Sequence, residues 1–290
     1  MRFVVVGGGA WGTAFAHLLG ERGHHIDVAR RETLDEAPYE LADVVVMAVP
    51  SGAFREVLAH VRGAAPLLSL VKGLDPASGE RLSTLVRDRP VAVLSGPNMA
   101  EEVRAGLPSA AVIASDDEEL ALRLQAATSS LAFRVYTNTD VIGVELCAAA
   151  KNVIALAAGG VDGLGLGDNA KAALITRGLA EMARLGEACG ASPDTFAGLA
   201  GMGDLIVTCW HPSGRNRRAG ELIARGSSPD AAREEIGQVV EGLTTAPVLR
   251  DLSRRIGVEL PITEGVCAVL EGMPLHELAE SLMGRRPTDE

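Results

Sequence analysis

The chain has 290 residues, of which 47% are hydrophobic, 22% are charged and only 3% are aromatic, and its net charge is −11. This length is enough for two ordinary domains, and the acidic balance argues against a nucleic-acid-binding protein, which would carry a basic face. The four cysteines form no CxxC pair and have no metal-like spacing, which indicates free thiols, a reducing cytoplasm and no metal site.

The first predicted elements are a strand, a glycine-rich turn and a helix. Residues 2–6 (RFVVV) are apolar and β-branched, the sequence GGGAWG follows at 7–12, and a helix is expected over 11–21. This apolar start imitates a secretory signal, but its glycines would interrupt a signal helix, so the strand–turn–helix interpretation is favoured. No segment reaches about 18 unbroken apolar residues, so no integral membrane segment is predicted.

Short apolar runs continue the alternation of strands and helices up to residue 138. The expected strands are 24–29, 43–50, 66–73, 90–97, 109–115 and 133–138, with helices over 54–61 and 118–127. Such alternation predicts a parallel sheet covered on both faces. Helical patterns follow at 140–158, 168–189, 215–225, 242–256 and 262–271, and DLIVTC (204–209) is the one strand-like stretch among them. The predicted fold class is α/β, with an N-terminal Rossmann-type parallel-sheet domain (1–138) followed by an all-α C-terminal domain (139–290).

The turn at 7–12 matches the dinucleotide-binding pattern G-x-G-x-x-G through Gly7, Gly9 and Gly12. The first glycine permits the tight turn, the second lets the backbone approach a pyrophosphate, and the third allows close helix–strand packing. The alternative is an ordinary strand–helix turn without a ligand. The position directly after a strand and before a helix favours the dinucleotide site.

The choice between NAD and NADP depends on the end of the second strand. An acid there would bind the ribose 2′-hydroxyl, whereas an arginine would accept a 2′-phosphate. Asp27 has the expected offset of about 20 residues from the first glycine, but it lies inside the strand, and Arg30 and Arg31 stand at the strand end. The sequence therefore predicts NADP or NAD with a weak preference for NADP, unless the two arginines are only solvated charges.

Lys151 stands in the middle of the apolar stretch LCAAAKNVIALAAGG (146–160). An ammonium buried without a partner costs several kcal/mol, so either its head reaches water along the helix or it serves a function. Lys72 follows a strand, at the edge where open α/β sheets bind ligands. Asp204 lies in a glycine-rich loop, where it could also be a cap. Arg215 opens a helix that could bind an anion or carry only solvated charge.

Taken together, these stretches resemble the NAD(P)-dependent glycerol-3-phosphate dehydrogenases. The matching stretches run in order over nearly the whole chain: GGGAWGTA, LVKG, SGPNMAEEV, AAAKNVIALAAGGVDGLGLGDNAKAALITRGLAEM, TFAGLAGMGDLIVTC, GRNRRAGELIARG and QVVEGLTTAPV. The resemblance implies hydride transfer between a nicotinamide ring and C2 of a small phosphorylated three-carbon substrate. That reaction interconverts dihydroxyacetone phosphate and sn-glycerol 3-phosphate and feeds glycerophospholipid synthesis in the cytoplasm. A homodimer is left open by the sequence.

The resemblance also implies roles for individual residues. Lys151 resembles the catalytic acid–base lysine, Lys72 the second active-site lysine, and Asp204 completes the catalytic set. The implied substrate-binding residues are Lys72, Gly96, Asn98, Lys151, Asn152, Asp204, Thr208, Gly214, Arg215 and Asn216. With the glycine turn and the two arginines, the cofactor-binding residues are Gly7, Gly9, Ala10, Trp11, Gly12, Arg30, Arg31, Lys72, Ala100, Arg215, Val239 and Glu241.

The sequence departs from the family pattern at three places. Gly214 stands where a serine is frequent, so only a backbone contact remains there, and Asn98 also stands where many members have serine. The connection 31–42 is shorter than usual and leaves no room for an additional strand–helix unit, so part of the wall near the adenosine is expected to be missing. Two other functions stay open: a two-domain reductase of an unphosphorylated hydroxy acid, and a non-catalytic nucleotide-binding redox sensor.

Overall fold

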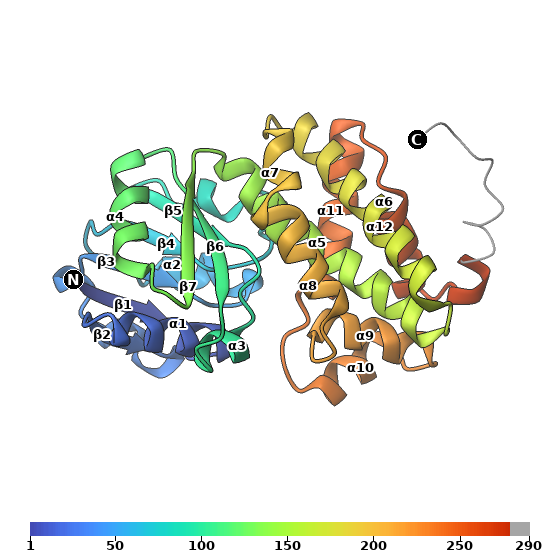
Figure 1. The fold of residues 1–290 in the computed structure, drawn as a ribbon, viewed down its shortest axis with the longest axis horizontal. Helices are drawn as coiled ribbons and strands as arrows, with labels where there is room; N and C mark the ends of the chain where they lie inside the picture. The colour runs from blue at the N-terminus through green and yellow to red at the C-terminus, as the bar shows by residue number, and fades with distance from the viewer. Residues whose placement is uncertain (279–290) are drawn as a thin grey trace.

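The apolar runs of the first half form seven strands of one sheet. In the computed structural model, which describes residues 1–278, the strand order is β2-β1-β3-β4-β5-β6-β7 (Figure 1). Each strand lies inside its predicted range, although β3, β4 and β5 end two to four residues before the predicted end. The strands are β1 (Arg2–Val6), β2 (His25–Ala29), β3 (Val44–Met47), β4 (Leu67–Ser69), β5 (Val91–Ser95), β6 (Ser109–Ala114) and β7 (Phe133–Asn138).

Helices cover both faces of this sheet, as predicted. Successive strand residues point to opposite faces, so Phe3 and Val5 pack with α1 (Ala10–Glu21) and α4 (Glu118–Thr128), whereas Val4 and Val6 pack on the side of α2 (Phe54–Leu58). α2 is shorter than expected. The short helix α3 (Ala100–Arg104), which the sequence reading missed, lies on the face of α1.

The predicted parallel sheet is confirmed except for one pair, because β6 runs antiparallel to β5. The connection between them contains only the five-residue helix α3. The whole connection, residues 96–108, is close to the minimum length for a parallel crossover, and it is shorter than the connections 48–66, 70–90 and 115–132 that join the parallel pairs. The other neighbouring pairs are parallel.

The short connection between β2 and β3 holds no further strand, as predicted. It consists of two turns of 3-10 helix, Arg31–Glu36 and Tyr39–Leu41, and β3 then pairs directly with β1. Leu34 and Tyr39 bury their side chains under this connection. The chain therefore crosses from one side of β1 to the other by the shortest available path.

The second half is helical and is arranged around α5 (Val141–Gly163), which runs through its centre (Figure 1). By length and mean hydropathy (1.7) α5 could cross a membrane, but 89% of the relevant stretch is buried inside the molecule, as in a core helix. Around it lie α6 (Gly167–Ala188), α7 (Pro193–Ala197), α8 (Asp204–Trp210), α9 (Arg215–Ala224), α10 (Pro229–Ile236), α11 (Glu241–Ile256) and α12 (Pro261–Leu270). The sequence reading missed α7 and α10.

DLIVTC, interpreted as strand-like, is the helix α8. A turn of π-helix at Leu199–Gly203 leads straight into it, and its β-branched residues lie along one helix instead of alternating across a sheet. Packing between helices has overridden the strand preference of Ile206, Val207 and Thr208.

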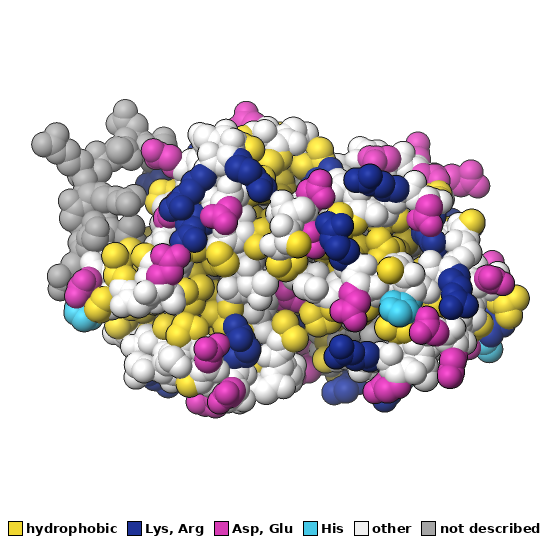
Figure 2. All heavy atoms as spheres, turned by 180° about the vertical axis from the view of Figure 1, so that it is seen from behind, with side chains coloured by type: hydrophobic (Ala, Val, Ile, Leu, Met, Phe, Trp, Pro, Cys, Tyr) yellow, Lys and Arg dark blue, Asp and Glu magenta, His cyan; other side chains and the backbone are white. Residues whose placement is uncertain are grey.

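The helical half also carries an apolar groove of about 710 Å³ lined mainly by residues of α5, α6 and α12. Seen from behind, hydrophobic side chains gather on this half of the molecule (Figure 2). Neither Lys72 nor Lys151 lines the groove.

Candidate active site

The glycine turn has the shape that a dinucleotide requires. Gly7 has a φ of +116°, and a Cβ added there would lie 2.3 Å from the carbonyl oxygen of Ala48. A Cβ added at Gly12 would lie 2.1 Å from the carbonyl oxygen of Gly7, so helix α1 packs directly on the turn. Beside Gly9 there is open space, which a pyrophosphate could approach. The residues present therefore fit a bound dinucleotide.

The residues around the glycine turn extend this candidate dinucleotide site. Ala10 begins α1, and the indole nitrogen of Trp11 is buried without a hydrogen-bond partner among residues 1–278. The Arg30 side chain lies against the turn, since a Cβ added at Gly8 would lie 3.1 Å from its Nε, and Arg31 follows on the surface.

Asp27 does not reach this crevice. It pairs with Arg2 at 2.8 Å and lies opposite Val4, in the middle of the strand. The position of Asp27 inside the strand thus agrees with the prediction.

Lys151, Asp204 and Lys72 meet where the two halves of the chain join. Lys151 comes from the middle of α5, Asp204 begins α8, and Lys72 follows β4. The ammonium of Lys151 donates to Asp204 Oδ1 at 2.5 Å, and that of Lys72 donates to Asp204 Oδ2 at 3.0 Å. Lys151 and Asp204 are buried and Lys72 is partly exposed, so one buried carboxylate binds two ammonium groups, of which only that of Lys151 is buried.

This environment shifts the pKa values of both buried groups, Lys151 and Asp204. Burial is the main cause that lowers the pKa of Lys151 to about 7, helped by the charge of Lys72 and opposed by Asp204. Burial alone would raise the pKa of Asp204, but Lys151 and Lys72 together lower it. A lysine with a pKa near 7 can both give and take a proton at neutral pH.

Thr208 holds Lys151 from a second side. The Thr208 hydroxyl donates to the carbonyl oxygen of Asp204 at 2.6 Å, so its oxygen is free to accept from Lys151 at 2.9 Å. A cysteine neighbour in the helix, Cys209, is buried, and burial raises the pKa of its thiol to about 12. It is therefore a thiol and not a second base.

The end of β5 and the turn after it bring polar groups to Lys72 and Asp204. Asn98 Oδ1 accepts from Lys72 at 3.0 Å, and the carbonyl oxygen of Gly96, at a φ of +137°, accepts at 3.4 Å. Asn98 Nδ2 is buried without a partner among the described residues, so one donor is left for a ligand. Ser95, which the sequence reading missed, donates to Asp204 at 3.2 Å.

The start of α9 places Gly214, Arg215 and Asn216 next to α5. Arg215 is exposed, and within residues 1–278 no ion pair of its guanidinium is found. Asn216 is instead engaged inside the protein: its Nδ2 donates to Asn152 Oδ1 at 2.9 Å, and its Oδ1 accepts from the backbone of Gly242 at 2.9 Å. Gly214 caps the helix.

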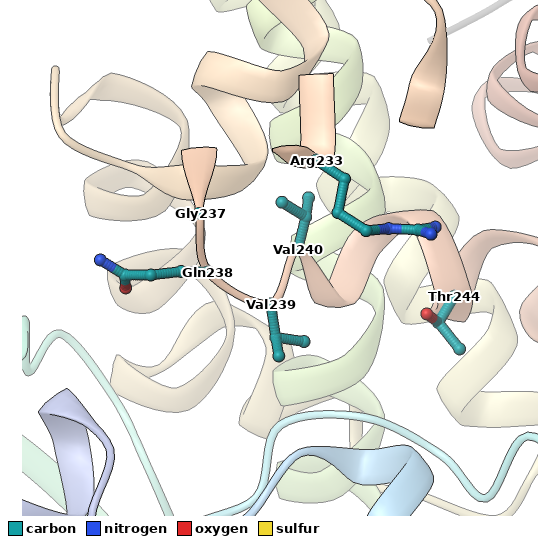
Figure 3. A pocket seen from close by; sticks show the side chains of 6 residues that line it. All are labelled: Arg233, Gly237, Gln238, Val239, Val240 and Thr244. Carbon is teal, nitrogen blue, oxygen red and sulfur yellow. The ribbon is translucent and has the colours of Figure 1, made fainter. Parts of the chain in front are cut away.

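The remaining predicted cofactor residues lie at two helix starts. Ala100 begins α3, and Glu241 begins α11. Val239 and Val240 point to opposite sides of the connection between α10 and α11 (Figure 3), and Val239 is 43% exposed, whereas Val240 is buried. This connection borders a surface pocket of about 350 Å³ lined by Arg233, Gly237, Gln238, Val239, Val240 and Thr244. The carboxylate of Glu241 is bound to Ser51.

Comparison with known proteins gives consistent matches. The family model described as "NAD-dependent glycerol-3-phosphate dehydrogenase N-terminus" matches residues 31–121, and its C-terminal counterpart matches residues 140–280. A glycerol-3-phosphate dehydrogenase (NAD(P)+) of Gloeobacter violaceus is 44% identical over 100% of this chain and 99% of its own length. One of Geobacillus kaustophilus is 43% identical over 99% of this chain and 95% of its own length.

A solved structure gives the same result. The crystal structure of glycerol-3-phosphate dehydrogenase from Coxiella burnetii matches with a TM-score of 0.92 and 34% identity, and the match covers 98% of this chain and 99% of that one. The similarity therefore extends over both halves of the fold and over the junction where the lysines meet.

Proposed function

The chain belongs to the NAD-dependent glycerol-3-phosphate dehydrogenase family, and from this premise we propose that the Lys151–Asp204–Lys72 cluster interconverts dihydroxyacetone phosphate and sn-glycerol 3-phosphate. The observation that carries this assignment is the single buried carboxylate that holds both lysines. We further assign cofactor binding to residues 1–138 and substrate binding to the residues that follow. The cellular role is glycerol phosphate supply for glycerophospholipid synthesis, in the cytoplasm.

The cofactor is held by the glycine turn and α1, with Arg30 alongside. When bound there, NADPH or NADH supplies a hydride to C2 of the ketone, and the oxidised form takes one from C2 of the alcohol. The protein has to provide the proton and to stabilise the charge on the C2 oxygen.

Lys151 provides that proton. As the C2 oxygen of the ketone gains negative charge, the Lys151 ammonium donates a proton to it and becomes a neutral amine; in the reverse direction the amine accepts the proton from the hydroxyl. Asp204 and Thr208 fix the position of Nζ. Lys72 adds a second positive charge beside the developing oxyanion, and Asn98 Nδ2 is the free donor for a substrate oxygen.

Arg215 binds the substrate phosphate. It is exposed, begins α9, and has its guanidinium available for a charge-assisted, bidentate contact with an anion. The backbone of Gly214 adds a helix N-terminus to this site. The phosphate thus distinguishes this substrate from an unphosphorylated ketone.

The test is NADPH oxidation with dihydroxyacetone phosphate and with unphosphorylated dihydroxyacetone. We expect a strong preference for the phosphorylated ketone. Arg215→Ala should raise its KM about tenfold or more, the value of one charge-assisted hydrogen bond, and should leave the KM for dihydroxyacetone nearly unchanged. Arg225→Ala, at the other end of α9, is the matched control and should have no selective effect.

The other outcomes identify the competing functions. A wild type that reduces both ketones equally well would point to a reductase of unphosphorylated substrates, whereas equal losses on both ketones in Arg215→Ala would mean that Arg215 is structural or serves the cofactor. Tight NADPH binding without oxidation of either ketone by the wild type would point to a redox sensor.

A further inference from the structure

A serine and a glutamate from opposite halves of the chain are joined by two hydrogen bonds beside the site. Ser51 opens a 3-10 turn after β3, and Glu241 opens α11. The Ser51 hydroxyl donates to Glu241 Oε2 at 2.6 Å, and its backbone N–H donates to Oε1 at 3.2 Å. Ser51 is 1% exposed and Glu241 is half-buried, so this contact is partly shielded from water.

A chain of buried amides leads back from α11 to the sheet. The backbone N–H of Gly242 donates to Asn216 Oδ1 at 2.9 Å, and Asn216 Nδ2 donates to Asn152 Oδ1 at 2.9 Å. Asn152 Nδ2 then donates to the carbonyl oxygen of Lys72 at 3.1 Å. Asn152 and Asn216 are both buried. In each of them the side-chain oxygen accepts, and the side-chain nitrogen donates, one hydrogen bond of this series.

These contacts close a ring that begins and ends on the sheet. Lys72 follows β4 and Ser51 follows β3, two neighbouring parallel strands. Ser51 packs on the backbone beside Lys72, since a Cβ added at Gly73 would lie 2.6 Å from the Cβ of Ser51. The helical half is therefore attached to the sheet at two points, just beyond the carboxyl ends of β3 and β4. Two attachments restrain rotation of the helical half against the sheet as well as its translation.

The ring contains the neighbours of the reacting groups. Asn152 is adjacent to Lys151, Asn216 is adjacent to Arg215, and Lys72 itself is a member. A shift of α11 against β3 would thus move Lys151 and Arg215, which both lie on the helical half, relative to Lys72, which follows a strand of the sheet. A misplacement of about 1 Å can cost a hundredfold in rate.

We propose that Ser51 and Glu241 are positioning residues, which lock the helical half on the sheet through this ring and thereby set the position of Lys151 and Arg215 relative to Lys72. The kinetic part of this proposal rests on the proposed function. Glu241 acts here through Ser51 and α11, in addition to any contact with the cofactor.

A second serine–glutamate pair offers a matched control. Ser83 donates its backbone N–H and its hydroxyl to Glu145 of α5, at 2.9 and 2.5 Å, and Glu145 is also paired with Arg81. This pair likewise joins the two halves and is buried, but it makes no contact with the ring. Ser83→Ala therefore removes a serine hydroxyl from the same kind of serine–glutamate pair, but outside the site.

The experiment compares Ser51→Ala with Ser83→Ala in steady-state kinetics and thermal unfolding. Ser51→Ala should lower kcat about tenfold, the value of one hydrogen bond to a charged group, and should change the KM for dihydroxyacetone phosphate less than twofold. Ser83→Ala should lower Tm and leave kcat within twofold of the wild type. An unchanged kcat in Ser51→Ala, with only a loss of Tm, overturns the proposal.

A double variant tests whether Glu241 acts through Ser51. Glu241→Gln should also lower kcat, and Ser51→Ala/Glu241→Gln should be no slower than the slower single variant. Fully additive losses, or a Glu241→Gln variant that changes only the KM for NADPH, would show that Glu241 serves the cofactor independently of Ser51.

Hydrogen exchange tests the ring without any turnover. Backbone amides at the start of α11, including that of Gly242, should exchange faster in Ser51→Ala than in the wild type or in Ser83→Ala. Unchanged exchange there overturns the ring. A wild type that fails to reduce dihydroxyacetone phosphate would instead refute the proposed function, and the exchange comparison would still decide the present inference.

Discussion

At the scale of single residues, the environment of Lys151 decides between the two explanations of a lysine in an apolar helix. Its ammonium does not reach water, because it is enclosed by Asp204 and Thr208 and the residue is 4% exposed. The interpretation in which its head reaches water along the helix is therefore wrong. The sequence indicated that Lys151 needs a partner, but it could not name the partner, since Asp204 is 53 residues away along the chain.

The pKa of Lys151 predicts how the rates of ketone reduction and alcohol oxidation depend on pH. A pKa of about 7 means that the ammonium needed for ketone reduction is lost as the pH rises through 7, whereas the amine needed for alcohol oxidation is gained. The kcat for reduction should thus fall, and that for oxidation should rise, across pH 6–8 (roughly one unit on either side of 7). Steady-state rates in both directions measure this.

Lys151→Met removes the charge and keeps most of the stem volume. It should lower kcat by about 10²–10⁴ and abolish both pH trends, with the fold intact by circular dichroism. Near-normal turnover in this variant, or an unchanged pH profile, would mean that the proton comes from another group.

Asn152 and Asn216 mark the limit of prediction for side chains. The family pattern places them at the substrate, and the structure brings them to the site, but both amides are bonded within the protein. Ser51 and Ser95 gave no signal in the sequence, since a serine after a strand is common and their partners Glu241 and Asp204 lie more than 100 residues away. Hydrogen bonds at this separation become visible only when the helices are packed.

At the scale of elements, the strands were predictable because they are short apolar runs that end at turn residues, and the long helices because they are long segments without such turns. The direction of β6 was not predictable, because it depends on the short connection 96–108 and not on the strand's own residues. α8 was missed for a related reason: its β-branched run is typical of a strand, and only its packing against α5 makes it helical.

Glycines determine how closely α5 and α9 pack. A Cβ added at Gly159 of α5 would lie 1.8 Å from the carbonyl oxygen of Arg217, and one added at Gly220 of α9 would lie 1.9 Å from that of Leu156. Backbone thus faces backbone at this crossing, and the first turn of α9, which carries Arg215, is held by it.

Gly159→Ala should therefore destabilise the protein even though alanine favours helices. The gain in helix propensity is at most about 1 kcal/mol, whereas overpacking against a rigid backbone costs about 1–3 kcal/mol and moves α9. We expect a lower free energy of unfolding in urea and a higher KM for dihydroxyacetone phosphate.

Gly20→Ala in α1 is the control for this substitution, because a Cβ added there meets nothing within 4 Å. It should be neutral or stabilise by up to about 1 kcal/mol. A Gly159→Ala variant as stable as Gly20→Ala would show that the two helices can separate at little cost.

At the scale of the whole molecule, an acidic protein has to bind two anionic ligands. The net charge of −11 repels both, so the attraction must come from a few local cations: Lys72, Lys151 and Arg215 for the substrate, and Arg30 with Arg31 for the cofactor. The short connection after β2 leaves these two arginines at the edge of the crevice, with only two 3-10 turns behind them.

This arrangement predicts a modest preference for NADPH over NADH. Arg30 lies against the glycine turn, where its guanidinium can pair with a 2′-phosphate, and Asp27 is held by Arg2 away from the ribose. Because the arginines are exposed, the pair is screened by salt. We expect kcat/KM to favour NADPH about tenfold, or ~1.4 kcal/mol, at low ionic strength and less at 1 M salt (roughly a 3 Å Debye length).

The double variant Arg30→Ala/Arg31→Ala should lose most of this preference, whereas Arg87→Ala/Arg123→Ala, which removes the same charge from exposed sites elsewhere on the sheet domain, should keep it. Both variants lose two positive charges, so the net charge of the protein changes equally in the two. The comparison therefore separates a local contact with the cofactor from the long-range electrostatic field of the protein. If both lose the preference equally, long-range attraction governs cofactor choice. If the wild type prefers NADH, Arg30 and Arg31 are only solvated charges, and the specificity comes from the part of the adenosine wall that the short connection retains.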